Sequence, residues 1–227
     1  MITLHALACH EAAVCEAPLL ALLSDDERAR LARLRRPEDR LRSLTGRAAA
    51  RLILGRCLGA APETLQFHDG PHGKPALNAA EHRAIHFNLA HSGEWVLLAI
   101  APSPVGVDIE HCTPGAADPL LAACFTEREQ AHIHSRRDGI AQWTAKEAVL
   151  KACGCGLTVD PASFEVLHDG THWATVAGPS SPPALAGFRV TRFCVKDDYC
   201  GALATADPAA SWRLIHENME ILLTEQA

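Results

Sequence analysis

Apolar residues follow two patterns along this chain, one with the period of a strand and one with the period of a helix. Short apolar or alternating runs bounded by turn residues predict strands at residues 2–9, 85–90, 95–101, 105–110, 164–168, 172–176, 188–195 and 201–206. Longer stretches of helical character predict helices at residues 25–34, 37–58, 127–134 and 140–153. Ser24 is placed to cap the first helix, Pro37 to begin the second and Gly59 to end it.

The order of these elements predicts an α+β fold built from two similar α/β halves. The sequence His68-Asp-Gly-Pro-His72 returns one hundred positions later as His168-Asp-Gly-Thr-His172, and Arg51 matches Lys151 at the same offset. Each half also closes with a pair of strands. We therefore expect a pseudo-twofold duplication, with one half at residues 1–103 and the other at residues 104–227.

Composition places the chain among ordinary globular proteins, with 48% apolar and 21% charged residues in 227 positions. The longest apolar runs, such as Trp95–Ala101, have the length of a strand, so we expect no membrane span. Glu11 and Glu16 interrupt the first apolar stretch, which argues against a signal peptide. Nine cysteines without regular spacing predict reduced thiols in a cytoplasmic protein, and the scattered histidines predict no zinc site.

Positive charge is concentrated in one segment of an otherwise acidic chain. Ten of the 21 Lys and Arg residues fall between Arg28 and Arg56, where only Glu38 and Asp39 oppose them, although the net charge is −6. This asymmetry predicts a local anion-binding surface. A solvated helix face is the alternative that the pattern leaves open.

Three carboxylates and a lysine are candidates for one site. Asp108 and Glu110 share one face of the strand at 105–110, because side chains alternate along a strand. Trp143, Glu147 and Lys151 share one face of a helix, because they are four residues apart. This combination suits a hard divalent cation that grips a phosphate, so phosphoryl-group chemistry is the leading hypothesis. The alternatives are an exposed Glu147–Lys151 pair and the solvated face of a strand.

Several short motifs, in a fixed order, resemble one enzyme family. They are Arg42-Ser-Leu-Thr-Gly46-Arg47, Gly73-Lys74-Pro75, Phe87-Asn-Leu-Ala-His-Ser-Gly93, Gly106-Val-Asp-Ile-Glu110, Trp143-Thr-Ala-Lys-Glu-Ala-Val-Leu-Lys151 and Gly154-Cys-Gly-Leu157. The chain is similar, over residues 23–205, to the 4′-phosphopantetheinyl transferases of the larger single-chain (surfactin-synthetase-activating) type. That family is built from two similar halves in one chain, which implies an active site at their interface and a monomer.

The resemblance implies Mg²⁺-dependent transfer of 4′-phosphopantetheine from coenzyme A to a serine of an apo acyl or peptidyl carrier protein, with release of adenosine 3′,5′-bisphosphate. Asp108, Glu110 and Glu147 are the implied Mg²⁺ ligands. The implied catalytic residues are Asp108, Glu147 and Lys151. Glu147 is the implied base that takes the serine proton, directly or through water, and Lys151 is the side chain that holds the phosphates. Which carrier is modified stays open: it could serve fatty acid, polyketide, peptide or siderophore synthesis.

The resemblance also implies a set of residues that bind coenzyme A. Arg30, Arg42, Lys74 and His91 are expected at its 3′-phosphate, and Gly73 and Pro75 in the loop against the adenine, with Lys151 at the phosphates. The sequence departs from the family in two places. Ala90 replaces a serine, which leaves a backbone amide near the ligand, and Glu27 stands where the family has a lysine. Glu129 matches a further acid of the family.

Two other classes of function fit the sequence less well. A non-catalytic module that binds coenzyme A or a nucleotide would tolerate damaged metal ligands, but all three carboxylates are present. An arginine-rich RNA-binding protein would need exposed aromatic residues and a dispersed basic face, whereas aromatics make up 5% of this acidic chain. We therefore expect neither a nucleic-acid partner nor a membrane partner.

Overall fold

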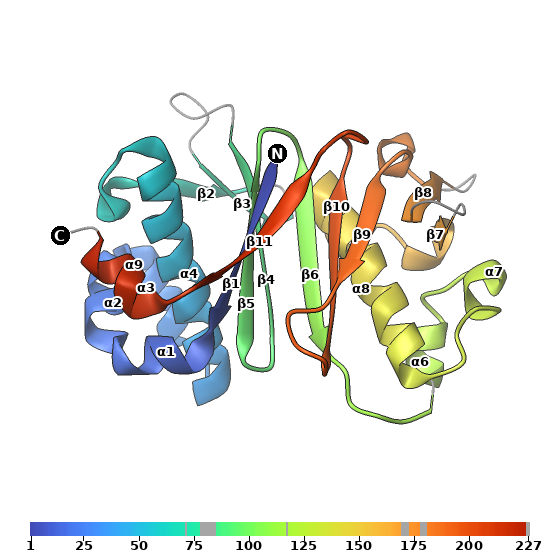
Figure 1. Ribbon diagram of the computed structural model, residues 1–227, viewed down its shortest axis with the longest axis horizontal. Helices are drawn as coiled ribbons and strands as arrows, with labels where there is room; N and C mark the ends of the chain where they lie inside the picture. The colour runs from blue at the N-terminus through green and yellow to red at the C-terminus, as the bar shows by residue number, and fades with distance from the viewer. Residues whose placement is uncertain (71, 78–84, 117, 169–172, 178–180, 226–227) are drawn as a thin grey trace.

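Two β-sheets lie in the middle of the molecule, and helices cover their outer faces (Figure 1). The computed structural model describes residues 1–70, 72–77, 85–116, 118–168, 173–177 and 181–225. Helices α1 to α4 and α9 lie on one side and helices α6 to α8 on the other. One apolar cluster fills the space between the sheets, including Leu4, Leu97, Val107 and Leu203. Two further clusters lie between each sheet and its own helices. The predicted α+β class is confirmed.

The first half of the chain supplies most of one sheet and its helices. Its strands are β1 (Ile2–Ala8), β2 (Phe67–Asp69), β3 (Pro75–Leu77), β4 (His86–Ser92) and β5 (Trp95–Ala101). Its helices are α1 (Cys9–Val14), α2 (Glu16–Leu22), α3 (Asp25–Ala32), α4 (Pro37–Leu58) and the 3₁₀ turn η1 (Pro62–Thr64). The sheet has the order β11-β1-β5-β4, and β2 pairs with β3 separately.

The second half forms a five-stranded sheet with the order β6-β10-β9-β8-β7. Its strands are β6 (Val105–His111), β7 (Phe164–His168), β8 (Trp173–Ala177), β9 (Arg189–Phe193) and β10 (Tyr199–Thr205). Its helices are α6 (Pro119–Ala122), α7 (Glu127–Gln130), α8 (Arg136–Cys153) and the 3₁₀ turns η2 (Gly156–Thr158), η3 (Pro161–Ser163) and η4 (Pro183–Leu185). Strand β11 (Trp212–Glu217) and helix α9 (Met219–Thr224) follow.

The capping signals in the sequence explain where the helices begin and end. Ser24 and Glu27 form a reciprocal capping box at the start of α3. Pro37 occupies the first turn of α4, and Gly59 ends that helix in the left-handed conformation with φ 63°. These predictions are confirmed. Ser135 caps α8, which therefore begins at Arg136, four residues before the predicted start at Ile140.

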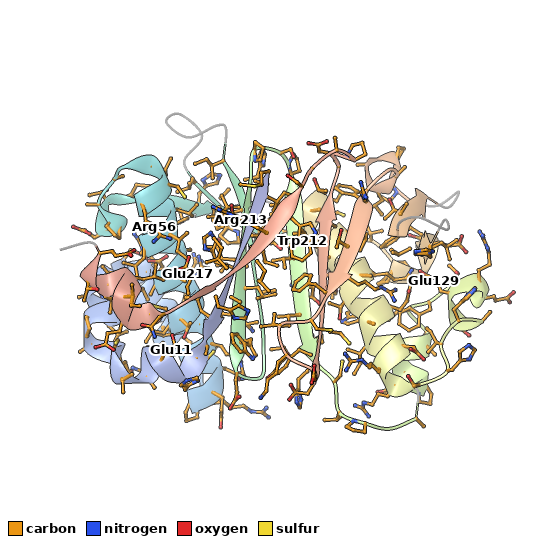
Figure 2. All side chains as sticks on the ribbon, in the orientation of Figure 1. Glu11, Arg56, Glu129, Trp212, Arg213 and Glu217 are labelled. Carbon is orange, nitrogen blue, oxygen red and sulfur yellow. The ribbon has the colours of Figure 1, made fainter. Side chains whose placement is uncertain are left out.

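The end of the chain returns to the first half, which the sequence pattern did not predict. Strand β11 pairs in parallel with β1, and Met219 and Leu222 of α9 belong to the core of the first half. Glu217 of β11 accepts from Arg56 of α4 at 3.3 Å and pairs with His5 at 2.6 Å (Figure 2). Residues 212–224 therefore pack with the first half, although they follow the second in sequence.

Other predicted elements differ in length. The helix expected at 127–134 is the single turn α7, which ends at Gln130, and helices α1 and α2 were not predicted. The strand expected at 172–176 is found at Trp173–Ala177, with residue 172 outside the described residues. The repeated pentapeptide also falls partly outside them, at residues 71 and 169–172. In the part of the chain that the structure describes, no helix is long and apolar enough to cross a membrane.

Helix α8 lies unusually close to strand β6 at Gly106. A Cβ atom at this position would lie 2.0 Å from the carbonyl oxygen of Ala148 and 2.3 Å from the nitrogen of Ala152. Both are backbone atoms of the helix, so no side-chain rotation could relieve the contact. The glycine of the Gly106–Glu110 motif is therefore required by helix-to-strand packing, and it fixes the distance between the two elements that carry the candidate acids.

We predict that Gly106→Ala lowers the free energy of unfolding by about 1–3 kcal/mol, because the strand and the helix must separate to admit the methyl group. Urea denaturation measures this loss. Gly139→Ala in α8 is the matched control, because a Cβ there meets only side-chain carbons at 3.6 and 3.7 Å. The control should gain up to about 1 kcal/mol from helix propensity. A Gly106→Ala protein as stable as the wild type would contradict the packing argument.

Candidate functional site

A cavity of about 370 Å³ lies where the two halves of the chain meet. The first half contributes residues of α4, β3, β4 and β5, and the second contributes residues of β6 and α8. The lining side chains are Arg42, Ser43, Gly46, Arg47, Pro75, Leu89, Ala90, His91, Val96, Asp108, Glu110, Trp143, Glu147 and Lys151. Both predicted faces, that of strand β6 and that of helix α8, thus line the same cavity.

Asp108 of β6 and Lys151 of α8 are in direct contact. Lys151 Nζ donates to Asp108 Oδ1 at 2.6 Å, and Asp108 is buried, with 5% of its surface exposed. Glu110 lies two residues further along the same face of the strand, and Glu147 lies one helical turn before Lys151. The structure therefore brings together the four charged side chains that the sequence pattern grouped.

The three carboxylates share an environment that opposes their charge. Burial raises the pKa of Asp108 and outweighs the attraction of Lys151. Burial also raises the pKa of Glu110 and the pKa of Glu147, and the charge of Asp108 raises both further. Such clustered acids bind a cation readily, because a nearby positive charge stabilises the ionised carboxylates, which burial and the charge of Asp108 disfavour.

A divalent cation fits this set of donors, which is made only of carboxylate oxygens. Asp108 Oδ2 and Glu147 Oε1 are buried and have no hydrogen-bond partner among the described residues. As the side chains stand, no three His, Cys, Asp or Glu residues in the described ranges converge closely enough to hold a metal ion. Lys151 meanwhile supplies the positive charge beside Asp108. Hard oxygen donors without partners are the ligands that Mg²⁺ prefers.

Ser92 orients one of the three acids, and the sequence analysis did not single it out. Its hydroxyl donates to Glu110 Oε2 at 2.8 Å and accepts from the backbone nitrogen of His111 at 3.1 Å. Ser92 ends β4 in the first half, so this bond crosses between the halves. Asn88 makes a second crossing, because its Oδ1 accepts from the backbone nitrogen of Val107 at 2.8 Å. Polar residues at alternate positions of β4 were the signal that could have identified both.

Cations of the first half form the opposite wall. Arg42 donates to the carbonyl of Gly93 at 2.9 Å and pairs with Asp39, and Arg47 also faces the cavity. Partial burial lowers the pKa of His91, and the nearby charges of Lys151 and Arg42 lower it further. The imidazole of His91 is therefore held toward its neutral form.

Lys74 and Gly73 have a structural role in addition to their place near the cavity. Lys74 Nζ donates to the carbonyl of Val105 at 3.0 Å and to the carbonyl of Lys151 at 2.6 Å, so it ties the end of α8 to the start of β6. Burial lowers the pKa of Lys74 to about 8. Gly73 has a φ of 78°, a left-handed conformation that favours glycine. Pro75 lines both the main cavity and an adjoining one of about 520 Å³ that Lys74 also lines.

Three other residues of the predicted set lie away from the carboxylates. Arg30 pairs with Asp69 at 2.8 Å, beside a separate small cavity of about 170 Å³. Glu27 forms a buried ion pair with Arg51 at 2.7 Å, and Arg51 is 2% exposed. Arg51 is thus neither a solvated helix residue nor a lining residue of the main cavity. Glu129 is buried against Lys146 at 2.8 Å, inside the second half.

The fold and the cavity together define a class of protein in which two α/β layers enclose a charged site. The clustered carboxylates of the site suit a cation, and its arginine and lysine side chains suit a ligand that carries phosphates. Comparison with known proteins agrees. Residues 16–103 match a family model described as 4′-phosphopantetheinyl transferase, N-terminal, and residues 104–204 match the 4′-phosphopantetheinyl transferase superfamily.

Three relatives illustrate the similarity. A putative 4′-phosphopantetheinyl transferase of Synechocystis sp. is 38% identical over 186 residues, which are 73% of this chain and 74% of the relative. A 4′-phosphopantetheinyl transferase of Bacillus subtilis is 30% identical over 84% of this chain and 85% of its own length. The 4′-phosphopantetheinyl transferase Sfp of Bacillus subtilis strain 168 is 28% identical over 75% and 79%. The chain belongs to the 4′-phosphopantetheinyl transferase superfamily, and to its larger, two-domain type.

We predict that Glu147→Gln raises the melting temperature at pH 7–8 in the presence of EDTA. Because the pKa of Glu147 is raised in the folded protein, the folded state binds a proton more tightly than the unfolded state does. The wild type therefore loses stability as the pH rises above the unfolded pKa of about 4.3, up to the folded pKa. A neutral glutamine avoids that loss.

The difference between the two proteins should disappear as the pH is lowered toward about 4, where the wild-type carboxyl is protonated. Differential scanning fluorimetry across this range measures it. Glu63→Gln, on an exposed turn outside the cavity, is the control and should show no such pH-dependent gain. A Glu147→Gln protein that melts below the wild type at pH 8 would show that the carboxylate is not electrostatically strained.

Proposed function

We propose that this protein transfers the 4′-phosphopantetheine group of coenzyme A to a serine of an apo acyl or peptidyl carrier protein and releases adenosine 3′,5′-bisphosphate. The observation that carries the proposal is the pair of buried, unpartnered oxygens, Asp108 Oδ2 and Glu147 Oε1, in a cavity that also presents Lys151, Arg42 and Arg47. Membership of the family supports the reaction, and the charged cavity supports a substrate that carries phosphates.

Asp108, Glu110 and Glu147 would hold a Mg²⁺ ion. When bound, this ion would neutralise charge on the pyrophosphate oxygens during phosphoryl transfer. Glu110 is pre-oriented for such a role by the hydroxyl of Ser92, and Asp108 by the ammonium of Lys151. Oxygen donors that are already positioned and partly dehydrated lose little entropy when they bind the metal.

Lys151 would bind a phosphate oxygen of the substrate, because its ammonium already lies in the cavity beside Asp108. Glu147 would accept the proton of the attacking serine, directly or through a water molecule. The position of Glu147 Oε1 supports this role, because this oxygen is buried at the cavity and has no hydrogen-bond partner among the described residues. The proton leaves the serine oxygen as that oxygen attacks the β-phosphorus of coenzyme A.

The first half would bind the nucleotide part of coenzyme A. Arg42 and His91 face the cavity and would donate to the 3′-phosphate. Arg30, which pairs with Asp69, and Lys74, which binds two carbonyls, would exchange those partners for the phosphate. Ala90 would place a backbone amide near the ligand but would lack the hydroxyl contact of the serine that the family usually carries there. Gly73 and Pro75 would shape the loop beside the adenine, and Pro75 suits this role because it lines both the main cavity and the adjoining one.

The two halves would be products of a duplication, divided at residues 103 and 104. Apart from β11, the two halves share a strand order. In the first half β5 pairs antiparallel with both β1 and β4, and in the second half β10 pairs antiparallel with both β6 and β9. Both also contain a capping-box glutamate, Glu27 or Glu129, buried against a cation of the long helix. A duplicated chain would form a complete active site between its halves, so a monomer would suffice.

We predict that incubation with coenzyme A, Mg²⁺ and apo carrier proteins adds one phosphopantetheine group to a carrier serine. Intact-protein mass spectrometry measures the product on a panel of acyl and peptidyl carriers. A carrier with the serine replaced by alanine is the control and should gain no mass. No gain on any carrier of a varied panel would contradict the proposed reaction.

We predict that Mg²⁺ raises the melting temperature of the wild type, because a cation relieves the repulsion among the three acids. Glu147→Gln should weaken Mg²⁺ affinity about 10- to 100-fold and lower kcat about 100- to 1,000-fold. Thermal titration with Mg²⁺ and carrier-loading kinetics provide the two readouts. Full activity of Glu147→Gln would refute the assignment of Glu147, and loss of activity with unchanged Mg²⁺ affinity would leave Glu147 only the role of base.

A further inference from the structure

Three cysteines gather at one end of the second sheet, outside the cavity. Cys112 follows strand β6, Cys200 lies in β10, and Cys194 directly follows β9. The sulfur atoms of Cys112 and Cys200 are 2.7 Å apart. Arg137, near the start of α8, joins the group, because its guanidinium donates to Cys194 Sγ at 3.5 Å and its carbonyl is 4.0 Å from Cys200 Sγ.

Strand register explains why Cys112 and Cys200 meet. Cys200 stands opposite Glu110 in the antiparallel ladder, and the backbone nitrogen of Cys112 donates to the carbonyl of Asp198 at 2.7 Å. The two cysteines are therefore diagonal neighbours on adjacent strands. Side chains alternate along β6, so Cys112 is on the same face of the sheet as Asp108 and Glu110.

The closeness of the two sulfur atoms favours a bond between them. Cys112 and Cys200 are 7% and 5% exposed, so they are shielded from bulky reagents but lie where the strands end. Burial raises the pKa of Cys200 to about 12, and the positive charge of Arg137 beside the cluster opposes that rise. Cys194, in contrast, is exposed and is the thiol that bulk solvent reaches first. Cys153 and Cys155, which line the adjoining cavity, are a second pair of thiols in side-chain contact, but they lie two residues apart in the chain and join no two strands.

We propose that Cys112 and Cys200 are a redox-active dithiol that a peroxide converts to a disulfide. One sulfur attacks the peroxide oxygen and becomes a sulfenic acid, with release of one water molecule. The second thiol attacks that sulfur, a sulfur–sulfur bond forms, and its proton leaves with the hydroxyl as a second water molecule. The two thiols lose two electrons and two protons, and hydrogen peroxide is reduced to two water molecules.

The disulfide would tie the strand that carries Glu110 to strand β10. It would also close a loop that contains all of helix α8, since the two cysteines bracket residues 113–199. A cross-link across so long a segment reduces the freedom of the unfolded chain and so stabilises the folded state. This bond forms independently of phosphopantetheinyl transfer, so its detection does not depend on the proposed reaction.

The test is oxidation of the reduced, full-length protein with a small excess of hydrogen peroxide, followed by alkylation of the remaining thiols and peptide mapping without reductant. We expect one cross-linked peptide pair, Cys112 with Cys200, with the mass of two hydrogen atoms lost, and alkylated Cys57. The melting temperature should rise by roughly 5–15 °C on oxidation and return to its starting value with dithiothreitol.

Cys112→Ala should abolish both the cross-link and the rise in melting temperature, whereas Cys57→Ala, on the exposed face of α4, should preserve both. If Cys112→Ala does not fold, the peptide map of the wild type alone decides the matter. The proposal is overturned if Cys112 and Cys200 both remain alkylatable while Cys194 is oxidised. A Cys194–Cys200 cross-link in place of the proposed one would overturn it equally.

Discussion

The backbone contact between helix α8 and strand β6 determines where the charged groups that the second half contributes to the site lie. Because Gly106 has no side chain, the helix lies against the strand at the level of Ala148 and Ala152. The helix face with Glu147 and Lys151 is then directed at the strand face with Asp108 and Glu110. Lys74 reinforces the contact from the first half, since its ammonium binds one carbonyl of each element. A larger residue at position 106 would separate the acids from the lysine.

This arrangement places unfavourable electrostatics in a folded core. Burial raises the pKa values of all three acids, and repulsion from neighbouring carboxylates raises those of Glu110 and Glu147 further. Two of their oxygens lack partners among the described residues. The apolar cluster between the sheets, which includes Val107 and Ile109 of the same strand, holds the acids in place despite this strain. One face of β6 therefore stabilises the fold. The opposite face carries buried negative charge, which destabilises the fold until a positively charged ligand binds. Such a division is typical of functional sites.

Local periodicity accounts for what could be predicted from the sequence. The period of two placed Asp108 with Glu110, and the spacing of four placed Glu147 with Lys151, because these relations depend only on neighbouring residues. The pairing of β11 with β1 was missed, since it joins residues about two hundred positions apart and no local pattern records it. Arg51 could not be told from its neighbours Arg47 and Arg56 by sequence. Its burial depends on Glu27 and on the carbonyls of Pro62 and Leu65, which tertiary packing brings to it.

The counterpart of Arg51 by contacts is Lys146 of α8, and not Lys151, which lies at the hundred-residue offset. Lys146 pairs with Glu129 and donates to the carbonyls of Pro161 and Phe164. The guanidinium of Arg51 is fully engaged, with the carboxylate of Glu27 and two backbone carbonyls as partners, all within the first half. A residue with so many internal bonds cannot leave them for a ligand without leaving buried polar groups unpaired. Lys151 has a single side-chain partner, Asp108, and 28% of its side chain is exposed toward the cavity. Its bond can be exchanged for a phosphate at small cost, because a cation can take its place beside Asp108. Each half thus keeps one cation of its long helix bonded inside its own core, Arg51 or Lys146, whereas the partly satisfied Lys151 remains available for a ligand.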